Sequence, residues 1–69
     1  MTWNYRVVKK DNYFAIHEAF YDEKSKKPHS ITAEPCEPYG ETLEELKEDI
    51  EWFTIALEKP VLNYKDFIK

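Results

Sequence analysis

The stretch from Gly40 to Pro60, GETLEELKEDIEWFTIALEKP, is the strongest structural signal in the sequence. Thr42 and Glu45 have the spacing of a capping box, and Pro60 is a residue before which helices usually end. We therefore expect a helix over about residues 42–59. Its apolar residues recur at steps of three and four, which is the pattern of one apolar stripe: Leu43, Leu46, Ile50, Phe53 and Leu57. One such helix can cover only one face of a sheet.

Three extended segments precede this helix. The first alternates apolar and polar residues with a period of two, and the turn formers Asp11 and Asn12 then predict a hairpin to the second. The third is weaker, because Pro35 and Pro38 cannot donate hydrogen bonds within a sheet and favour a sheet edge. We expect strands at about residues 2–9, 13–22 and 30–37.

This order of elements predicts a single α+β domain over residues 1–69. Its architecture would be a three-stranded antiparallel meander with one C-terminal helix packed on one face. The remaining tail, residues 60–69, is too apolar to be free in solvent. Three placements stay open for it: packing back on the domain, adding a short strand, or reaching a neighbouring subunit.

The second strand carries apolar residues on both faces, because successive side chains of a strand point in opposite directions. Glu18 lies among the apolar residues of one face. If it is buried it needs a partner such as Arg6 of the first strand, so we expect a structural pair; a carboxylate that binds another molecule is the alternative. The opposite face would stay open if the helix covers the first, and open apolar faces often mark association. We expect a dimer through that face, at Tyr13, Ala15, His17 and Ala19, or through strand edges.

The length of the chain supports self-association, because 69 residues bury only a marginal core. Cys36 is the only cysteine, so no intrachain disulfide can stabilise the fold, and we expect a homodimer or a larger oligomer. A lone thiol fits a reducing compartment. There is no apolar run of the ~20 residues needed to span a bilayer and no signal-peptide pattern. We expect a cytoplasmic protein with no membrane partner.

The net charge of −4 at pH 7 works against direct nucleic-acid binding, which depends on basic side chains. The one basic cluster, Lys24, Lys26 and Lys27, lacks interleaved aromatics, and we interpret it as a flexible, solvated loop tip. A basic partner suits an acidic chain better. For contact with such a partner we expect the helix acids and one sheet aromatic: Glu44, Glu48, Glu51 and Tyr21.

Groups that could carry chemistry are few. Carboxylates at three- and four-residue spacing could form a metal site or an acid–base pair, but acids on a helix more often suit its dipole and a solvated face; they are Glu41, Glu45, Glu48 and Asp49. Cys36 could act with His17 or His29, yet no spacing supports a nucleophile or a zinc site. We expect no catalytic residue, metal or cofactor, and hence no enzyme.

Two short blocks of the sequence resemble the HicB-like antitoxin family. They are the hairpin YRVVKKDNYFAIHE and the block PCEPYGETLEEL, together with the helix that follows. The resemblance covers most of residues 3–58. The positions that keep the family's spacing are Cys36, Gly40, Thr42, Glu44 and Glu45.

The resemblance implies a reduced ribonuclease-H-like domain that forms dimers or larger oligomers. It also implies a non-catalytic antitoxin that neutralises a small basic ribonuclease toxin by occlusion. Pro35 directly precedes Cys36, where the family has an intervening glycine, and the family's C-terminal DNA-binding domain is expected to be missing. The alternative is an orphan structural or regulatory homo-oligomer with no toxin partner.

Overall fold

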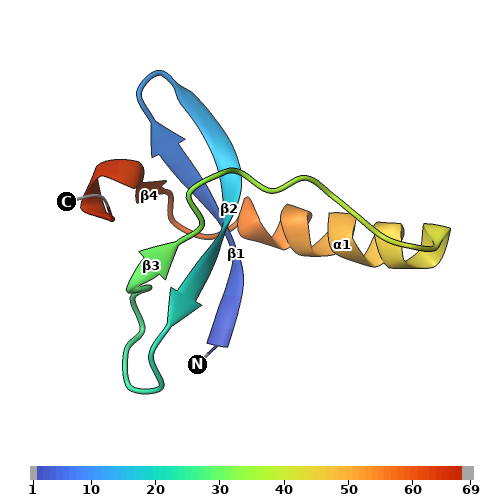
Figure 1. The fold of residues 1–69 in the computed structure, drawn as a ribbon, viewed down its shortest axis with the longest axis horizontal. Coiled ribbons are helices and arrows are strands. Elements are labelled where there is room, and N and C mark those ends of the chain that lie inside the picture. Colours follow the sequence, from blue (N-terminus) through green and yellow to red (C-terminus); the bar gives the residue numbers. More distant parts are fainter. Residues whose placement is uncertain (1, 68–69) are drawn as a thin grey trace.

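The computed structural model describes residues 2–67 and has an α+β fold (Figure 1). One helix accompanies a sheet whose strands lie in the order β3-β2-β1-β4. The strands are antiparallel except for β1 and β4, which run parallel. The elements in chain order are β1 (Thr2–Lys10), β2 (Tyr13–Tyr21), β3 (Ser30–Ile31), α1 (Leu43–Ala56), β4 (Leu62–Asn63) and the short 3₁₀ helix η1 (Tyr64–Asp66).

The predicted hairpin forms the centre of the sheet. Its register runs from Thr2 opposite Tyr21 to Lys10 opposite Tyr13. Only two residues connect the strands, and Asp11 has a φ of 54°, in the left-handed region that tight hairpin turns require. Asp tolerates this conformation better than most residues with a side chain, which explains its place in the turn.

β3 is shorter than the expected strand of residues 30–37, because regular pairing stops after Ile31. The chain nevertheless continues beside β2. The amide of Thr32 donates to the Glu18 carbonyl at 3.0 Å, and the amide of Cys36 donates to the Ile16 carbonyl at 2.8 Å. Pro35 has no amide hydrogen, so a continuous ladder cannot form there.

The tail forms a fourth strand, so the prediction of a three-stranded sheet is wrong. β4 pairs with β1 through Val8 opposite Leu62 and Lys9 opposite Asn63. After β4, the Tyr64 ring lies 6.1 Å from the His17 ring, and the Lys10 ammonium lies 4.4 Å from the Tyr64 ring centroid. The tail thus both adds a strand and packs back on the domain; Ile68 and Lys69 of the expected tail lie outside the described residues.

Helix α1 begins at the predicted cap and ends three residues earlier than expected. The Thr42 hydroxyl oxygen accepts a 3.1 Å hydrogen bond from the Glu45 amide, while the Glu45 carboxylate accepts one from the Glu41 amide at 3.2 Å. The C-terminal half of α1 crosses β1, where Phe53 and Tyr5 place their ring centroids 4.5 Å apart. The N-terminal half projects beyond the hairpin, and residues 32–42 run beside it (Figure 1).

The helix and the tail cover opposite faces of the hairpin. Tyr5, which contacts α1, lies opposite Glu18 in the sheet register and shares its face. His17 and Lys10 lie on the other face, under Tyr64. The predicted arrangement of one helix on one face is therefore present, but the second face is not left open.

The hydrophobic core of this chain is small. Among the described residues, the buried apolar side chains are Val7, Val8, Ala19 and Ala56. The accessible surface is 5601 Å², whereas a compact monomer of 8.3 kDa exposes about 4,600 Å². The radius of gyration, 12.4 Å, also exceeds the roughly 11 Å expected for this length. The single chain therefore leaves roughly 1,000 Å² more surface exposed than a compact domain does.

Candidate interaction surface

Helix α1 presents apolar residues to solvent instead of to the sheet. Leu43, Ile50 and Leu57 are 66%, 47% and 68% exposed. They lie seven residues apart, which is close to two helical turns, so they form one line along the helix. We call these three residues the helix stripe. Ala56 is the only buried residue of α1, because the helix meets the hairpin mainly through its last two turns.

A second apolar area lies on the other flank of the helix. Trp52 is 60% exposed and Trp3 is 52% exposed. Together with Asn4 and Tyr5 they line a hollow of about 360 Å³. The rings of Trp3 and Tyr5 pack edge to face with centroids 5.2 Å apart, so aromatic rings in mutual contact form part of this flank.

The predicted partner-binding acids share one side of α1. Glu44, Glu48 and Glu51 stand at i, i+4 and i+7, which places them on the same face. All three are exposed, and none forms an ion pair within residues 2–67. We call them the acidic ridge. The ridge lies away from the sheet, so its charge is available to a molecule that approaches the helix.

Asp49 has a structural role that could not be expected from its place among the helix acids alone. One carboxylate oxygen accepts a 2.7 Å hydrogen bond from the Tyr5 hydroxyl, and the other accepts a 2.8 Å bond from the Tyr39 amide. Burial raises the pKa of Tyr5 well above its ordinary value, and the hydrogen bond to Asp49 and its negative charge add to this effect. Asp49 stands one helical turn before Phe53, and this position on the sheet side of the helix was the sequence signal for a contact with the sheet.

The helix carboxylates whose spacing could suit a metal site or an acid–base pair do not converge. Glu45 caps the helix, Asp49 bonds Tyr5 and Tyr39, and Glu41 and Glu48 are exposed. Within residues 2–67 no group of three or more histidine, cysteine or acidic side chains could hold a metal ion. No helix in this part of the chain is long and apolar enough to cross a bilayer.

The expected pair of Glu18 with Arg6 is wrong. The register sets Arg6 opposite His17 and Glu18 opposite Tyr5, so the two side chains lie on opposite faces of the hairpin. Glu18 instead accepts a 3.7 Å hydrogen bond from the Cys36 thiol. Burial, together with the negative charge of Glu18, raises the pKa of Cys36, which favours the neutral thiol.

The four residues expected at a dimer interface differ in their exposure. His17 and Ala19 are 2% and 0% exposed, because residues of the same chain cover them. The Nδ1 atom of His17 lies 2.9 Å from the Thr32 carbonyl oxygen. Tyr13 is 49% exposed and Ala15 is half-buried, so only these two offer surface to a partner. The interface itself stays a prediction.

Tyr21 is separated from the acidic ridge. Its hydroxyl oxygen accepts a 2.8 Å hydrogen bond from Arg6, on the face of the hairpin opposite the helix. The structure therefore groups three of the four expected partner-binding residues and leaves the fourth elsewhere. Of the five residues expected in one apolar stripe, Leu46 and Phe53 are half-buried, whereas the helix stripe of Leu43, Ile50 and Leu57 is exposed.

Comparison with models of known protein families, with curated proteins and with solved structures finds no significant match to this chain. The resemblance to HicB-like antitoxins stays a prediction.

Proposed function

We propose that this chain is a non-catalytic protein-binding module that completes its own fold by self-association. The observation that carries this proposal is the exposure of the helix stripe, Leu43, Ile50 and Leu57, in a chain whose described part buries four apolar side chains. Burying one Leu or Ile side chain contributes about 1.5–3 kcal/mol. Two copies that pair their stripes would bury six such side chains.

The amount of surplus surface agrees with a partner of this size. A standard protein interface buries about 800 Å² on each partner, and this chain exposes roughly 1,000 Å² beyond a compact monomer. The seven-residue spacing of the stripe favours a second helix, because helices that cross at a small angle pair such positions. We therefore propose that the stripes of two copies pack against each other.

In this arrangement the acidic ridge faces outward and serves a second, basic partner. Exposed like charges raise the association rate with a partner of opposite sign. We propose that this partner is a small basic protein, and that the module acts as HicB-like antitoxins do, by covering a basic ribonuclease. An orphan oligomer would use the helix stripe in the same way but would leave the ridge in water.

Self-association is tested by light scattering and sedimentation of the full chain. We expect the unmodified chain to be a dimer or larger and Ile50→Glu to be monomeric at the same concentration. Ile55→Glu is the matched control: Ile55 is 40% exposed on the same helix but points about 140° away from Ile50, and this variant should remain associated. A compact monomer of the unmodified chain at high concentration would refute the proposal.

The basic partner is tested by co-expression with a small basic protein encoded beside this chain. Glu44→Gln, Glu48→Gln and Glu51→Gln together should slow association and reduce its salt dependence. The control removes three exposed acids elsewhere, Glu34→Gln, Glu37→Gln and Glu58→Gln. Equal losses in both variants would point to net charge alone, and no binding at any salt concentration would leave the orphan oligomer as the function.

A further inference from the structure

Arg6 is a buried cation without a carboxylate partner among the described residues. It is 8% exposed, and its two terminal nitrogens donate to neutral acceptors, the Tyr21 hydroxyl at 2.8 Å and the Pro60 carbonyl at 2.7 Å. The Nε atom has no hydrogen-bond partner. Burying a charge is costly unless it is paired and hydrogen-bonded, so this arrangement calls for an anion nearby.

Arg6 lines two hollows. One, of about 610 Å³, is lined by residues that include Asn4, Arg6, Tyr21, Lys26 and Lys59. The Oδ1 atom of Asn4 and the Nε atom of Arg6 are the two buried side-chain polar atoms without a partner within residues 2–67, and both residues line this hollow.

The second hollow, of about 540 Å³, combines three cations with apolar walls. Arg6, Lys26 and Lys27 supply the positive charge, and Asp66 is the one acidic side chain among the described residues that line it. Pro28, Pro60, Leu62 and Phe67 form the walls. In a chain of net charge −4, this is a local excess of positive charge beside an apolar surface. Small-molecule sites commonly have this size and this mixture of apolar walls with a few polar groups.

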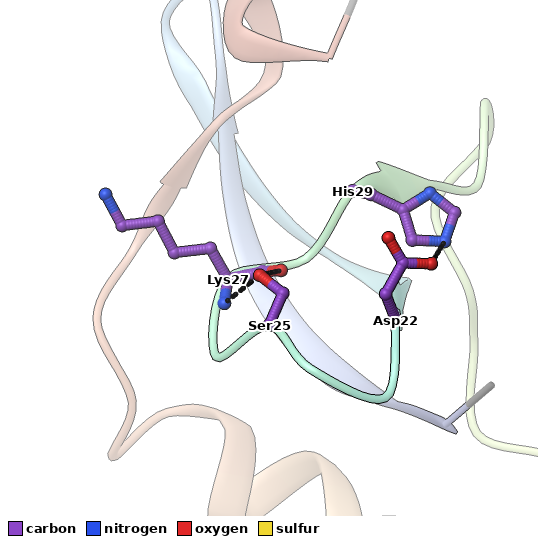
Figure 2. Close-up of polar contacts among 4 residues, drawn as sticks. All are labelled: Asp22, Ser25, Lys27 and His29. Carbon is purple, nitrogen blue, oxygen red and sulfur yellow. Dashed lines mark hydrogen bonds and ion pairs between the residues drawn. The ribbon is translucent and has the colours of Figure 1, made fainter.

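The exposed loop that carries Lys26 and Lys27 contains local hydrogen bonds. Ser25 Oγ donates to the Lys27 carbonyl at 3.0 Å and accepts from the Lys27 amide at 3.2 Å (Figure 2). His29 lies 3.5 Å from the Asp22 carboxylate at the base of the loop, and its amide bonds the Phe20 carbonyl. Lys26 and Lys27 both line the second hollow.

We propose that the hollow between Arg6 and Phe67 binds a carboxylate that carries an apolar body. The carboxylate would sit among Arg6, Lys26 and Lys27, because these three side chains supply the positive charge of the hollow. The apolar body would lie against Pro28, Leu62 and Phe67. The proposal is independent of the proposed function, because the site lies on the face of the hairpin that the helix does not touch.

The probe is 3-phenylpropionate, titrated into the full chain labelled with ¹⁵N. We expect saturable shifts of the Arg6 Nε–H and of the Lys26 and Lys27 amides. Two related compounds separate charge from apolar contact: 3-phenylpropan-1-ol keeps the ring without the charge, and acetate keeps the charge without the ring. Both should bind at least about tenfold more weakly than the acid, because each lacks one of the two contacts. A tenfold difference corresponds to about 1.4 kcal/mol.

A pair of variants tests the residues. Lys26→Gln with Lys27→Gln should weaken 3-phenylpropionate about tenfold or more, as expected for two charge-assisted contacts. The control, Lys24→Gln with Lys47→Gln, removes the same charge outside the hollow and should leave the affinity unchanged. All four lysines are exposed, so the variants are expected to fold.

A short peptide ending in a free phenylalanine carboxylate identifies the source of the ligand. Tighter binding of the peptide than of 3-phenylpropionate supports the site as a receptor for a protein C-terminus, and tighter binding of the small acid supports a free metabolite. The proposal is overturned if acid and alcohol bind equally, if neither saturates, or if the shifts fall around Trp3 and Trp52 instead.

Discussion

The Tyr5 hydroxyl donates a 2.7 Å hydrogen bond to Asp49, and this bond joins the hairpin to the helix. The other oxygen of Asp49 accepts from the Tyr39 amide at 2.8 Å, so one carboxylate links β1, α1 and the segment before the helix. Because residues 2–67 bury only four apolar side chains, polar contacts of this kind have a large share in holding the helix in place.

Replacing Asp49 with alanine should lower the free energy of unfolding by about 2 kcal/mol. Hydrogen bonds to a charged group contribute about 1.5–3 kcal/mol each, and partial access of water reduces the combined loss. Glu48→Ala, on the exposed side of the helix, should change stability by no more than about 0.5 kcal/mol. Urea titrations at one fixed protein concentration compare the two variants, and equal losses would contradict the role of Asp49.

The pH dependence of stability should carry the signature of Tyr5. An unfolded tyrosine loses its proton near pH 10, whereas burial and Asp49 raise the pKa of Tyr5 in the folded chain. Above about pH 10 the unfolded state therefore binds fewer protons, and the free energy of unfolding falls as pH rises. Tyr5→Phe should show a shallower fall between about pH 10 and 11.5. Parallel curves for the two proteins would contradict this linkage.

Local signals in the sequence were sufficient for the hairpin and the helix. Alternation in residues 2–9, the turn at Asp11 and the capping pair of Thr42 and Glu45 each depend on neighbours in sequence. The structure contains each of these features, with the helix ending at Ala56. Such features are predictable because short-range geometry decides them.

Long-range pairings were not predictable in the same way. The parallel pairing of Leu62 with Val8 joins residues more than fifty positions apart, and two residues give no strand periodicity. The register that sends Arg6 to the His17 face depends on a turn of two residues; one residue more or less would reverse the faces. The exposure of the helix stripe follows from where α1 crosses β1, which its own sequence does not encode.

Gly40 is required by close approach to the first turn of the helix. A Cβ at this position would overlap the backbone nitrogen of Leu46 and lie 2.7 Å from the carbonyl carbon of Glu45. The neighbouring atoms are backbone and cannot move aside without shifting the helix start. Gly40→Ala should therefore cost about 1–3 kcal/mol of stability, as overpacking does. Thermal or urea unfolding measures the loss, and an unchanged or increased stability would show that the segment relaxes freely.

The contact of Tyr64 with His17 tests whether the tail belongs to the fold of its own chain. Tyr64 covers His17 and receives the Lys10 ammonium on its ring, so Tyr64→Ala should remove both contacts. We expect a loss of about 1.5 kcal/mol, because the ring is half-buried and the cation contact adds to its burial. Tyr39→Ala removes a ring that is 69% exposed and should cost less.

Amide exchange gives the decisive measurement: β1 should lose protection in Tyr64→Ala at every protein concentration. A loss that depends on concentration would mean that the tail of a second copy, and not the chain's own tail, covers His17.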